Sequence, residues 1–196
     1  MTADVRLGVL ASGRGSNLRN LVELGYRVVA VASNRPSCGA AAIARERGIA
    51  LGEFSQRSFG SLEERDRAMR DWLGQHGVEL VVNAGYDRVL SHCFVAAFAG
   101  RMLNVHPSLL PAFGGGMDAV EQALAHGVKV SGCTVHLVTD EVDAGPILVQ
   151  AAVPVEPGDT PETLHARIQL QEHRILPEAI ELLARSIAEK SAPLSK

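Results

Sequence analysis

Short apolar runs alternate with helix-forming segments along the first half of the chain, and this alternation constrains the fold more than any other feature. The apolar runs predict strands at 5–11, 26–33, 49–54, 79–84 and 101–106. The segments between them predict helices at 18–24, 61–76 and 91–97, and an alanine-rich helix that ends at Gly48. Strands separated by helices of this length form right-handed βαβ units. We therefore expect a Rossmann-like parallel sheet with helices on both faces.

The second half of the chain has a different pattern. After a loop rich in proline and glycine at 111–116, a short helix is expected to end near His126. Strands are expected at 131–138 and 147–155, separated by an acidic loop. The expected α/β fold therefore has a mixed sheet in its C-terminal half.

A long amphipathic helix is expected from Thr160 to about Lys190. Pro161 suits its first turn, because an N–H group at that position has no partner within the helix. Pro177 falls inside the same pattern and predicts a kink or break just before it. No internal repeat or linker divides the chain, so we expect one domain over residues 1–196.

The composition is that of an ordinary soluble globular protein. The chain has 196 residues, of which 46% are hydrophobic and 21% charged, and its net charge is −3. No basic excess predicts a nucleic-acid surface. No apolar run approaches the roughly 18 residues that span a bilayer, and no signal peptide is recognised. We expect a protein without nucleic-acid or membrane partners.

The cysteines predict a reducing compartment and no metal site. Cys38, Cys93 and Cys133 are odd in number and have no C-x-x-C spacing, which favours the cytoplasm over a disulfide framework. Close Cys–His pairs occur at Cys133/His136 and His92/Cys93, and neither has a second pair at zinc-finger spacing. We therefore predict no bound metal.

Two polar side chains stand at the end of one predicted strand. Asn104 and His106 alternate with Leu103 and Val105, so the amide and the imidazole point the same way. Pro107 cannot donate to a sheet ladder and ends the strand. Ligands bind at such strand ends in open α/β sheets, which makes the pair a candidate site. The alternative is a hydrogen-bonded core histidine.

A glycine-rich turn at 12–17 joins the first strand to the first helix. Backbone N–H groups at a helix N-terminus bind phosphate without a charged side chain. The dinucleotide pattern G-x-G-x-x-G fits both glycines of the turn but not Leu18, and the Walker and G-x-S-x-G patterns are absent. We expect a mononucleotide-like phosphate site. The alternative is a tight turn in which Ser16 or Asn17 caps the helix.

An acidic loop at 139–146 lies between the last two predicted strands. A carboxylate in this loop could meet His106 across neighbouring strand ends, where it would favour the charged imidazolium form. The alternative is a solvated turn rich in aspartate and glycine, which is common for such loops.

Five segments give the sequence a family resemblance. They are ASGRGSNL at 11–18, NAGYDRVLS at 83–91, LNVHPSLLP at 103–111, GCTVHLVTDEVDAGPILVQ at 132–150 and QLQEH at 169–173. With them, the chain resembles the glycinamide ribonucleotide formyltransferases from about Arg6 to Leu183. HPSLLP and the later D-x-G-P are shared by the wider formyltransferase superfamily, whereas SGRGSN and QEH narrow the resemblance to this branch.

The resemblance implies a role for each matched segment. The catalytic residues would be Asn104, His106 and Asp143. The substrate 5-phosphoribosylglycinamide would be bound by Gly15, Ser16, Asn17, Gln169 and Glu172. The formyl donor, 10-formyltetrahydrofolate, would be bound by Arg88, Val89, Leu90, Thr139, Asp140, Glu141 and Val142. No metal is implied, the partners would be these two small molecules, and the protein would be a monomer or a homodimer. A cis Leu110–Pro111 bond is also implied.

Three positions depart from the family pattern. Leu62 stands where relatives carry a substrate-contacting arginine, with Arg57 and Arg65 nearby. Asp87 replaces a methionine beside the expected folate pocket, where a carboxylate is unexpected unless it points outward. The loop at 113–118 lacks the usual histidine and carries three glycines, so we expect it to be mobile, as a lid would need to be.

Three other functions remain open from the sequence. A formyltetrahydrofolate hydrolase would use the same three catalytic residues with water as the nucleophile, although such relatives carry an N-terminal regulatory domain and the first strand here begins by Val5. A methionyl-tRNA formyltransferase would need a C-terminal RNA-binding domain beyond Lys196. A non-catalytic phosphate-binding module would not need the set Asn104, His106 and Asp143.

Overall fold

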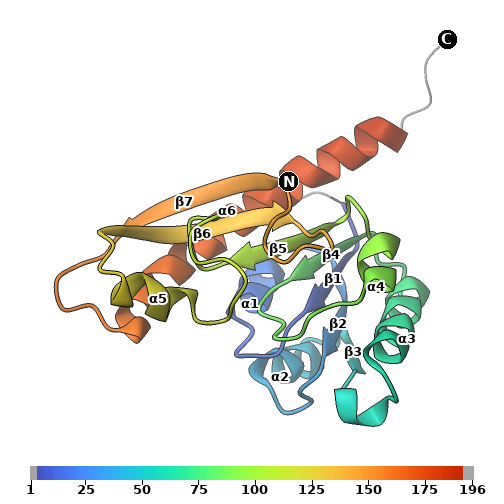
Figure 1. The fold of residues 1–196 in the computed structure, drawn as a ribbon. Helices are drawn as coiled ribbons and strands as arrows, with labels where there is room; N and C mark the ends of the chain where they lie inside the picture. Colours follow the sequence, from blue (N-terminus) through green and yellow to red (C-terminus); the bar gives the residue numbers. More distant parts are fainter. Residues whose placement is uncertain (1–3, 192–196) are drawn as a thin grey trace.

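The computed structural model describes residues 4–191 (Figure 1). The first half contains β1 (Leu7–Leu10), α1 (Ser16–Glu23), β2 (Val28–Ser33), α2 (Gly39–Glu46), β3 (Ala50–Glu53), the 3-10 helix η1 (Gln56–Ser58), α3 (Leu62–Gln75), β4 (Leu80–Asn83), α4 (His92–Ala97) and β5 (Met102–His106). The second half contains α5 (Ala119–Ala125), β6 (Val130–Leu137), β7 (Ile147–Pro154) and α6 (Pro161–Ser191). Apart from η1, each element matches a segment predicted from the sequence.

The strands form a seven-stranded sheet in the order β3-β2-β1-β4-β5-β6-β7. Strands β1 to β5 pair in parallel, and β6 and β7 continue the sheet in antiparallel register. The expected α/β fold, parallel in the first half and mixed in the second, is confirmed. The chain order reverses between β1 and β4, which is where open α/β sheets bind ligands.

Helices cover both faces of the sheet (Figure 1). One apolar core packs strand residues such as Val9 and Leu103 against α1, α2, α5 and α6. The other core packs Leu10 and Met102 against α3 and α4. Neighbouring strand residues thus enter opposite cores, as the two-residue period of a strand requires. Both faces are therefore buried, which explains the continuous apolar runs of the central strands.

Helix α6 runs unbroken through Pro177, so of the kink or break predicted there the break is wrong and the kink stays a prediction. Proline has no N–H to offer the carbonyl of His173, four residues earlier. The side-chain amide of Asn20 in α1 donates to that carbonyl over 2.8 Å. A tertiary contact therefore replaces the missing helical hydrogen bond and removes part of the cost of an internal proline.

The loop after β5 is fixed by one buried hydroxyl. β5 ends at His106 before Pro107, as predicted, and the Leu110–Pro111 bond is cis, as the resemblance implied. Thr134 donates from Oγ1 to the carbonyl of Ser108 over 2.7 Å and accepts from the N–H of Leu110 over 3.0 Å. These bonds hold the chain immediately beyond His106 and so help to orient the imidazole.

Candidate active site

A cavity of about 450 Å³ lies at the C-terminal ends of the parallel strands. Every residue predicted to act in catalysis or binding lines this cavity: Gly15, Ser16, Asn17, Arg88, Val89, Leu90, Asn104, His106, Thr139, Asp140, Glu141, Val142, Asp143, Gln169 and Glu172. Segments far apart in the sequence therefore converge on one site. The individual roles assigned to these residues remain predictions.

Asn104, His106 and Asp143 meet at one end of the cavity. Nδ1 of His106 lies 3.4 Å from Oδ2 of Asp143, and Nδ2 of Asn104 donates to Oδ1 of the same carboxylate over 3.2 Å. The His106 and Asp143 side chains are 6% and 9% exposed, so water screens their interaction little. The acidic loop thus contributes a buried carboxylate, and the alternative of a fully solvated turn is wrong for Asp143.

His136 is a further histidine at this cluster, and sequence reasoning considered it only as a zinc ligand. It lies opposite Asn104 in the register between β5 and β6. Its Nδ1 donates to the carbonyl of Leu137, and its Nε2 lies 3.1 Å from Nδ2 of Asn104 and 3.5 Å from Oδ1 of Asp143. A neutral His136 accepts from Asn104, and a protonated one donates to Asp143. Strand pairing was the signal that could have found it.

The Asp143 carboxylate is held in its ionised form. Burial alone would raise the pKa of Asp143. Hydrogen bonds from His136 and from the N–H of Gly115, together with the neighbouring charge of His106, outweigh burial and hold the pKa below its ordinary value. A negatively charged carboxylate therefore lies 3.4 Å from Nδ1 of His106.

The loop at 113–117 lies directly against these catalytic candidates. The carbonyl of Phe113 accepts a hydrogen bond from Nε2 of His106 over 3.0 Å, and the N–H of Gly115 donates to Oδ2 of Asp143 over 2.8 Å. Phe113 has a φ of 56°, which is strained for a residue with a side chain. The loop therefore occupies hydrogen-bonding groups that a substrate would need.

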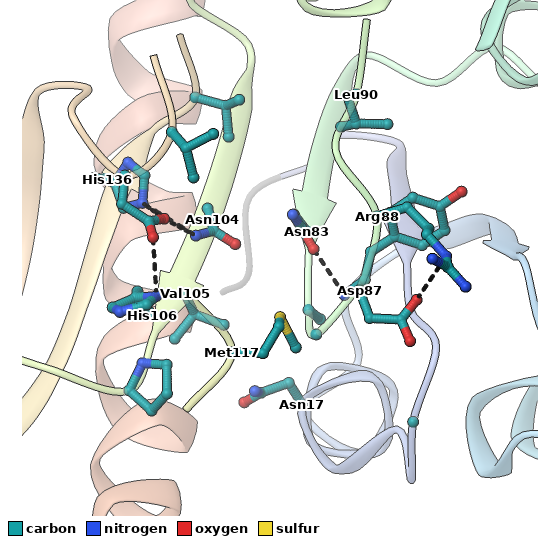
Figure 2. Close-up of a pocket in the computed structure, with 18 of the residues that line it drawn as sticks. Asn17, Asn83, Asp87, Arg88, Leu90, Asn104, Val105, His106, Met117 and His136 are labelled. Carbon is teal, nitrogen blue, oxygen red and sulfur yellow. Dashed lines mark hydrogen bonds and ion pairs between the residues drawn. The ribbon is translucent and has the colours of Figure 1, made fainter. Parts of the chain in front are cut away.

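Figure 2 shows the two sides of the cavity. Asn104, His106 and His136 lie on one side. Asn83, Asp87, Arg88 and Leu90 lie across from them. The open space between the two groups is where a reacting molecule would have to sit.

The turn at 12–17 leaves the N-terminus of α1 uncapped by side chains. Gly15 is the N-cap residue of α1, with a φ of 78° and no side-chain capping bond, so the alternative in which Ser16 or Asn17 caps the helix is wrong. A Cβ at Gly15 would lie 2.7 Å from Cα of Ala40, which is why glycine is required. The backbone N–H groups of the first turn therefore remain available to an anion.

Helix α6 closes the end of the cavity that contains the 12–17 turn. Gln169 donates from Nε2 to Oγ of Ser16 over 2.8 Å. Asn17 donates from Nδ2 to the buried carboxylate of Glu172 over 2.9 Å. From the residues alone, Glu172 would have been read as an ordinary helix-surface charge, because nothing in the local pattern reveals its burial.

The expected folate end has apolar walls. Val89 and Val142 present exposed side chains at its mouth, and Leu90, Val95 and Val138 also line it. Nδ1 of His92 lies 2.8 Å from Oδ2 of Asp140, which joins the start of α4 to the 139–142 loop. Such walls suit the flat faces of conjugated rings, while polar groups at the cavity wall can bind the polar edge of such a ring.

The departure at Leu62 removes the expected arginine from this site, and neither nearby arginine replaces it. Leu62, Arg57 and Arg65 are all absent from the cavity wall. Arg65 is 1% exposed and paired with Asp66, so it is not available to a substrate. Any contact made by that arginine in relatives is missing here or supplied by another residue.

Asp87 is held by its neighbours at the edge of the cavity. Its carboxylate accepts from Nδ2 of Asn34 over 2.8 Å, forms an ion pair with Arg35, and lies 3.7 Å from Nε of Arg88. Burial raises the pKa of Asp87, but the Asn34 hydrogen bond and the two arginine charges hold it below its ordinary value. The negative charge of this unexpected carboxylate is therefore balanced by arginine side chains of the protein.

No group of three or more histidine, cysteine, aspartate or glutamate side chains suited to a metal ion occurs among residues 4–191. In the same part of the chain, every helix is too short or too polar to cross a lipid bilayer.

Comparisons with known proteins agree with this geometry. The Formyl transferase family model matches residues 5–180. Trifunctional purine biosynthetic protein adenosine-3 of Gallus gallus is 42% identical over 189 residues, which are 93% of this chain, and the chain spans only 19% of that protein's length. Phosphoribosylglycinamide formyltransferase of Mycobacterium tuberculosis is 46% identical over 188 residues, covering 93% of this chain and 86% of the relative.

A solved structure is also similar. Glycinamide ribonucleotide transformylase 1 from Symbiobacterium toebii has a TM-score of 0.90 and 46% identity, covering 95% of this chain and 90% of that one. The family match spans most of the chain, and the fold and the cavity have the arrangement that the motifs predicted. The chain therefore belongs to the formyl transferase family.

Proposed function

We propose that this protein transfers a formyl group from 10-formyltetrahydrofolate to the amine of 5-phosphoribosylglycinamide, a step of purine synthesis. Family membership and relatives named phosphoribosylglycinamide formyltransferase support the reaction class. We further propose that residues 1–196 act as one domain in the cytoplasm, as a monomer or homodimer, on small molecules and without nucleic acid.

The phosphate end would bind the acceptor substrate. The uncapped first turn of α1 offers backbone N–H groups from 15–17 to the phosphate. Gln169 and Glu172 lie one helical turn apart on α6 and contact Ser16 and Asn17. The Glu172 carboxylate has the chemistry to accept hydrogen bonds from ribose hydroxyls.

The folate end would bind the formyl donor, which supplies the formyl carbon and a nitrogen leaving group. Arg88, Val89 and Leu90 face the 139–142 loop across the cavity. A volume of about 450 Å³ lies within the range of small-molecule sites, and the wall combines apolar side chains with a few polar groups.

The three catalytic residues would then act on the transferred group. As the glycinamide nitrogen bonds to the formyl carbon, negative charge develops on the formyl oxygen. Asn104 and His106 donate hydrogen bonds to that oxygen. As the bond between the formyl carbon and the folate nitrogen breaks, His106 supplies a proton to that nitrogen, and the attacking amine gives a proton to solvent water, from which His106 is reprotonated. Asp143 orients His106 through the contact with Nδ1.

One observation carries this proposal: His106, Asn104 and a buried, ionised Asp143 lie within one cavity with an uncapped helix N-terminus. A phosphate-binding module has no use for the buried histidine–carboxylate pair. A phosphorylated amine substrate, by contrast, could use both features: the helix N-terminus would bind its phosphate, and His106 would act as the acid near its amine.

The direct test is an absorbance assay for loss of 10-formyltetrahydrofolate by the purified protein, with and without 5-phosphoribosylglycinamide. Turnover that requires the amine is expected. Equal turnover without it would identify a hydrolase, and no turnover in either case would identify a binding module. We expect exhaustive EDTA treatment to leave the rate unchanged.

A further inference from the structure

Helix α3 carries an ion pair that is fully buried. The side chains of Arg65 and Asp66 are 1% and 0% exposed, and Nε of Arg65 donates to Oδ1 of Asp66 over 2.8 Å. Burying two charges is costly unless further hydrogen bonds satisfy both groups. Most charged residues of α3 can stay in contact with water, so the burial of this pair needs an explanation. The other hydrogen bonds of the two side chains give one.

Those other contacts all lead to one neighbouring segment. Arg65 donates from its terminal guanidinium nitrogen to the carbonyl of Val89 over 3.0 Å. Asp66 accepts from the N–H of Ser91 through Oδ2 over 2.6 Å. The ion pair therefore forms hydrogen bonds to the backbone on both sides of Leu90. Neither charged residue lines the cavity, whereas Val89 and Leu90 do.

The same segment contains backbone N–H groups that have no acceptor within the described protein. The N–H of Asp87 is bound by Oγ of Ser12, and the N–H of Ser91 by Asp66. Between these anchors, the N–H groups of Arg88 and Leu90 donate to no residue among those the structure describes. The N–H of Val89 likewise has no acceptor among the described residues, so three consecutive N–H groups of cavity-lining residues lie between the two anchored ones.

Tyr86 also contacts the guanidinium group of Arg65. The guanidinium of Arg65 lies 5.9 Å from the centre of the Tyr86 ring, within the range of a cation–π contact. Tyr86 is 4% exposed and packs in the core shared by α3 and α4. The ion pair is therefore embedded in a rigid surround, as a positioning element needs to be.

We propose that Arg65 and Asp66 are a positioning pair that fixes Arg88–Leu90 in the conformation that binds the formyl donor, and that they set the affinity for this donor without touching it. The inference rests on the proposed function, because it assigns the folate end of that same site. It extends the site to two residues behind the cavity wall that contact neither substrate.

The test is the double variant Arg65→Met/Asp66→Asn, which removes both charges together. It leaves no unpaired buried charge, keeps an oxygen for the N–H of Ser91, and deletes the donor to Val89. We expect the KM for 10-formyltetrahydrofolate to rise about tenfold, as for loss of one charge-assisted hydrogen bond. The kcat and the KM for 5-phosphoribosylglycinamide should stay within about twofold, on the view that uniform donor binding alone is lost.

A matched control lies on the same helix. Arg70 and Asp71 form an ion pair with the same adjacent spacing and a similar Nε–Oδ1 distance of 2.8 Å, but their side chains are 35% and 58% exposed. Arg70→Met/Asp71→Asn should leave all three kinetic constants unchanged. A merely structural role of α3 would disturb both substrates alike, and this split between the two KM values would not appear.

A second variant covers the case in which the double variant does not fold. Arg65→Lys keeps a positive charge beside Asp66 but lacks the second guanidinium nitrogen that reaches Val89, so donor KM should again rise selectively. A folded variant of either kind with wild-type donor KM overturns the positioning role alone. Calorimetry of the wild-type protein with tetrahydrofolate distinguishes failure of the positioning role from failure of the proposed function. Wild-type protein that neither binds tetrahydrofolate nor turns over would overturn the proposed function as well.

Discussion

Two walls of the same cavity are built in different ways. The segment 86–91 is anchored by side chains from other elements, among them the buried pair of Arg65 and Asp66. The loop 113–117 contains three successive glycines and reaches the site through its own backbone, at His106 and Asp143. The segment 86–91 is held by residues outside the cavity, whereas the loop 113–117 is held by hydrogen bonds to His106 and Asp143.

This difference indicates different tasks during a reaction. A wall fixed by partners outside the cavity keeps its shape when a ligand binds. Binding therefore loses little conformational entropy in that segment. A wall bound to Nε2 of His106 must release that group before the imidazolium can donate to a substrate. The 113–117 loop is therefore expected to exchange contacts with the substrate, as a lid does.

The largest effect should follow from removing the group shared by the reaction and the loop. His106→Ala should lower kcat by about 100-fold or more, because one oxyanion donor contributes about 3 kcal/mol in the transition state. Steady-state assays measure this, with circular dichroism to verify folding. His76→Ala is the control, since His76 lies at the end of α3 outside the cavity wall and its Nδ1 donates to the carbonyl of Trp72. Near-wild-type turnover by His106→Ala would remove this residue from the mechanism.

Hydrogen exchange compares the two walls directly. In the ligand-free protein, the N–H groups of Asp87 and Ser91, resolved by fragmentation, should exchange at least about tenfold more slowly than those of 112–118, because both donate to buried side chains and the loop has few apolar contacts. Mass spectrometry after pulses of deuterium gives both rates in one sample. Equal rates would mean that the loop is as fixed as the opposite wall.

A smaller effect is expected from Gly115→Ala, which strains the loop without filling space. Gly115 has a φ of 84°, and a Cβ there would meet nothing within 4 Å. The strain of about 1–2 kcal/mol should weaken the contact with Asp143 and lower kcat/KM severalfold. Gly100 has a φ of 69° and equally open surroundings away from the cavity, so Gly100→Ala should lower stability and leave kinetics unchanged. Equal kinetics in both variants would argue against a lid.

The smallest effect concerns the outer anchor of the fixed wall. Asp87→Asn should lower the free energy of unfolding at pH 7 by about 1 kcal/mol, because the Arg35 partner is 57% exposed and largely screened. The pKa of Asp87 is lowered in the folded state, so its contribution is present above the unfolded pKa of about 4 and is lost as pH falls through the folded value. Urea denaturation of wild type and variant should therefore converge toward about pH 3.

The same experiment has an internal reference. Glu53→Gln breaks the Arg45–Glu53 pair, in which both side chains are about half exposed, and should change stability at pH 7 by less than about 0.5 kcal/mol. A constant difference between Asp87→Asn and wild type from pH 7 to pH 3 would contradict the lowered pKa.

Much of the site was readable from the sequence because it depends on local chemistry. Alternation on β5 predicted that Asn104 and His106 share a face, and Pro107 marked the strand end. The spacing of glycines marked the phosphate turn, although the geometry of Gly15 decided against a side-chain cap. These features need only the period of a strand and the start of a helix.

The rest depends on contacts between distant elements. His136 joins the site through strand register, which no local pattern fixes. Arg65 and Asp66 lie in a highly charged helix segment that reads as solvent-exposed, and only its packing buries them. The predicted break at Pro177 failed because Asn20, far away in sequence, satisfies the freed carbonyl. Tertiary partners overrode local expectation in all three cases.

The central claim is that the amine of the phosphorylated substrate receives the formyl carbon in this cavity. Incubation of the purified protein with 5-phosphoribosylglycinamide and donor carrying carbon-13 in the formyl group, followed by NMR, reports where that carbon goes. We predict that the label appears as an amide on the glycinamide nitrogen and that His106→Ala abolishes its appearance. Label recovered as free formate, with the glycinamide unchanged, would contradict the account.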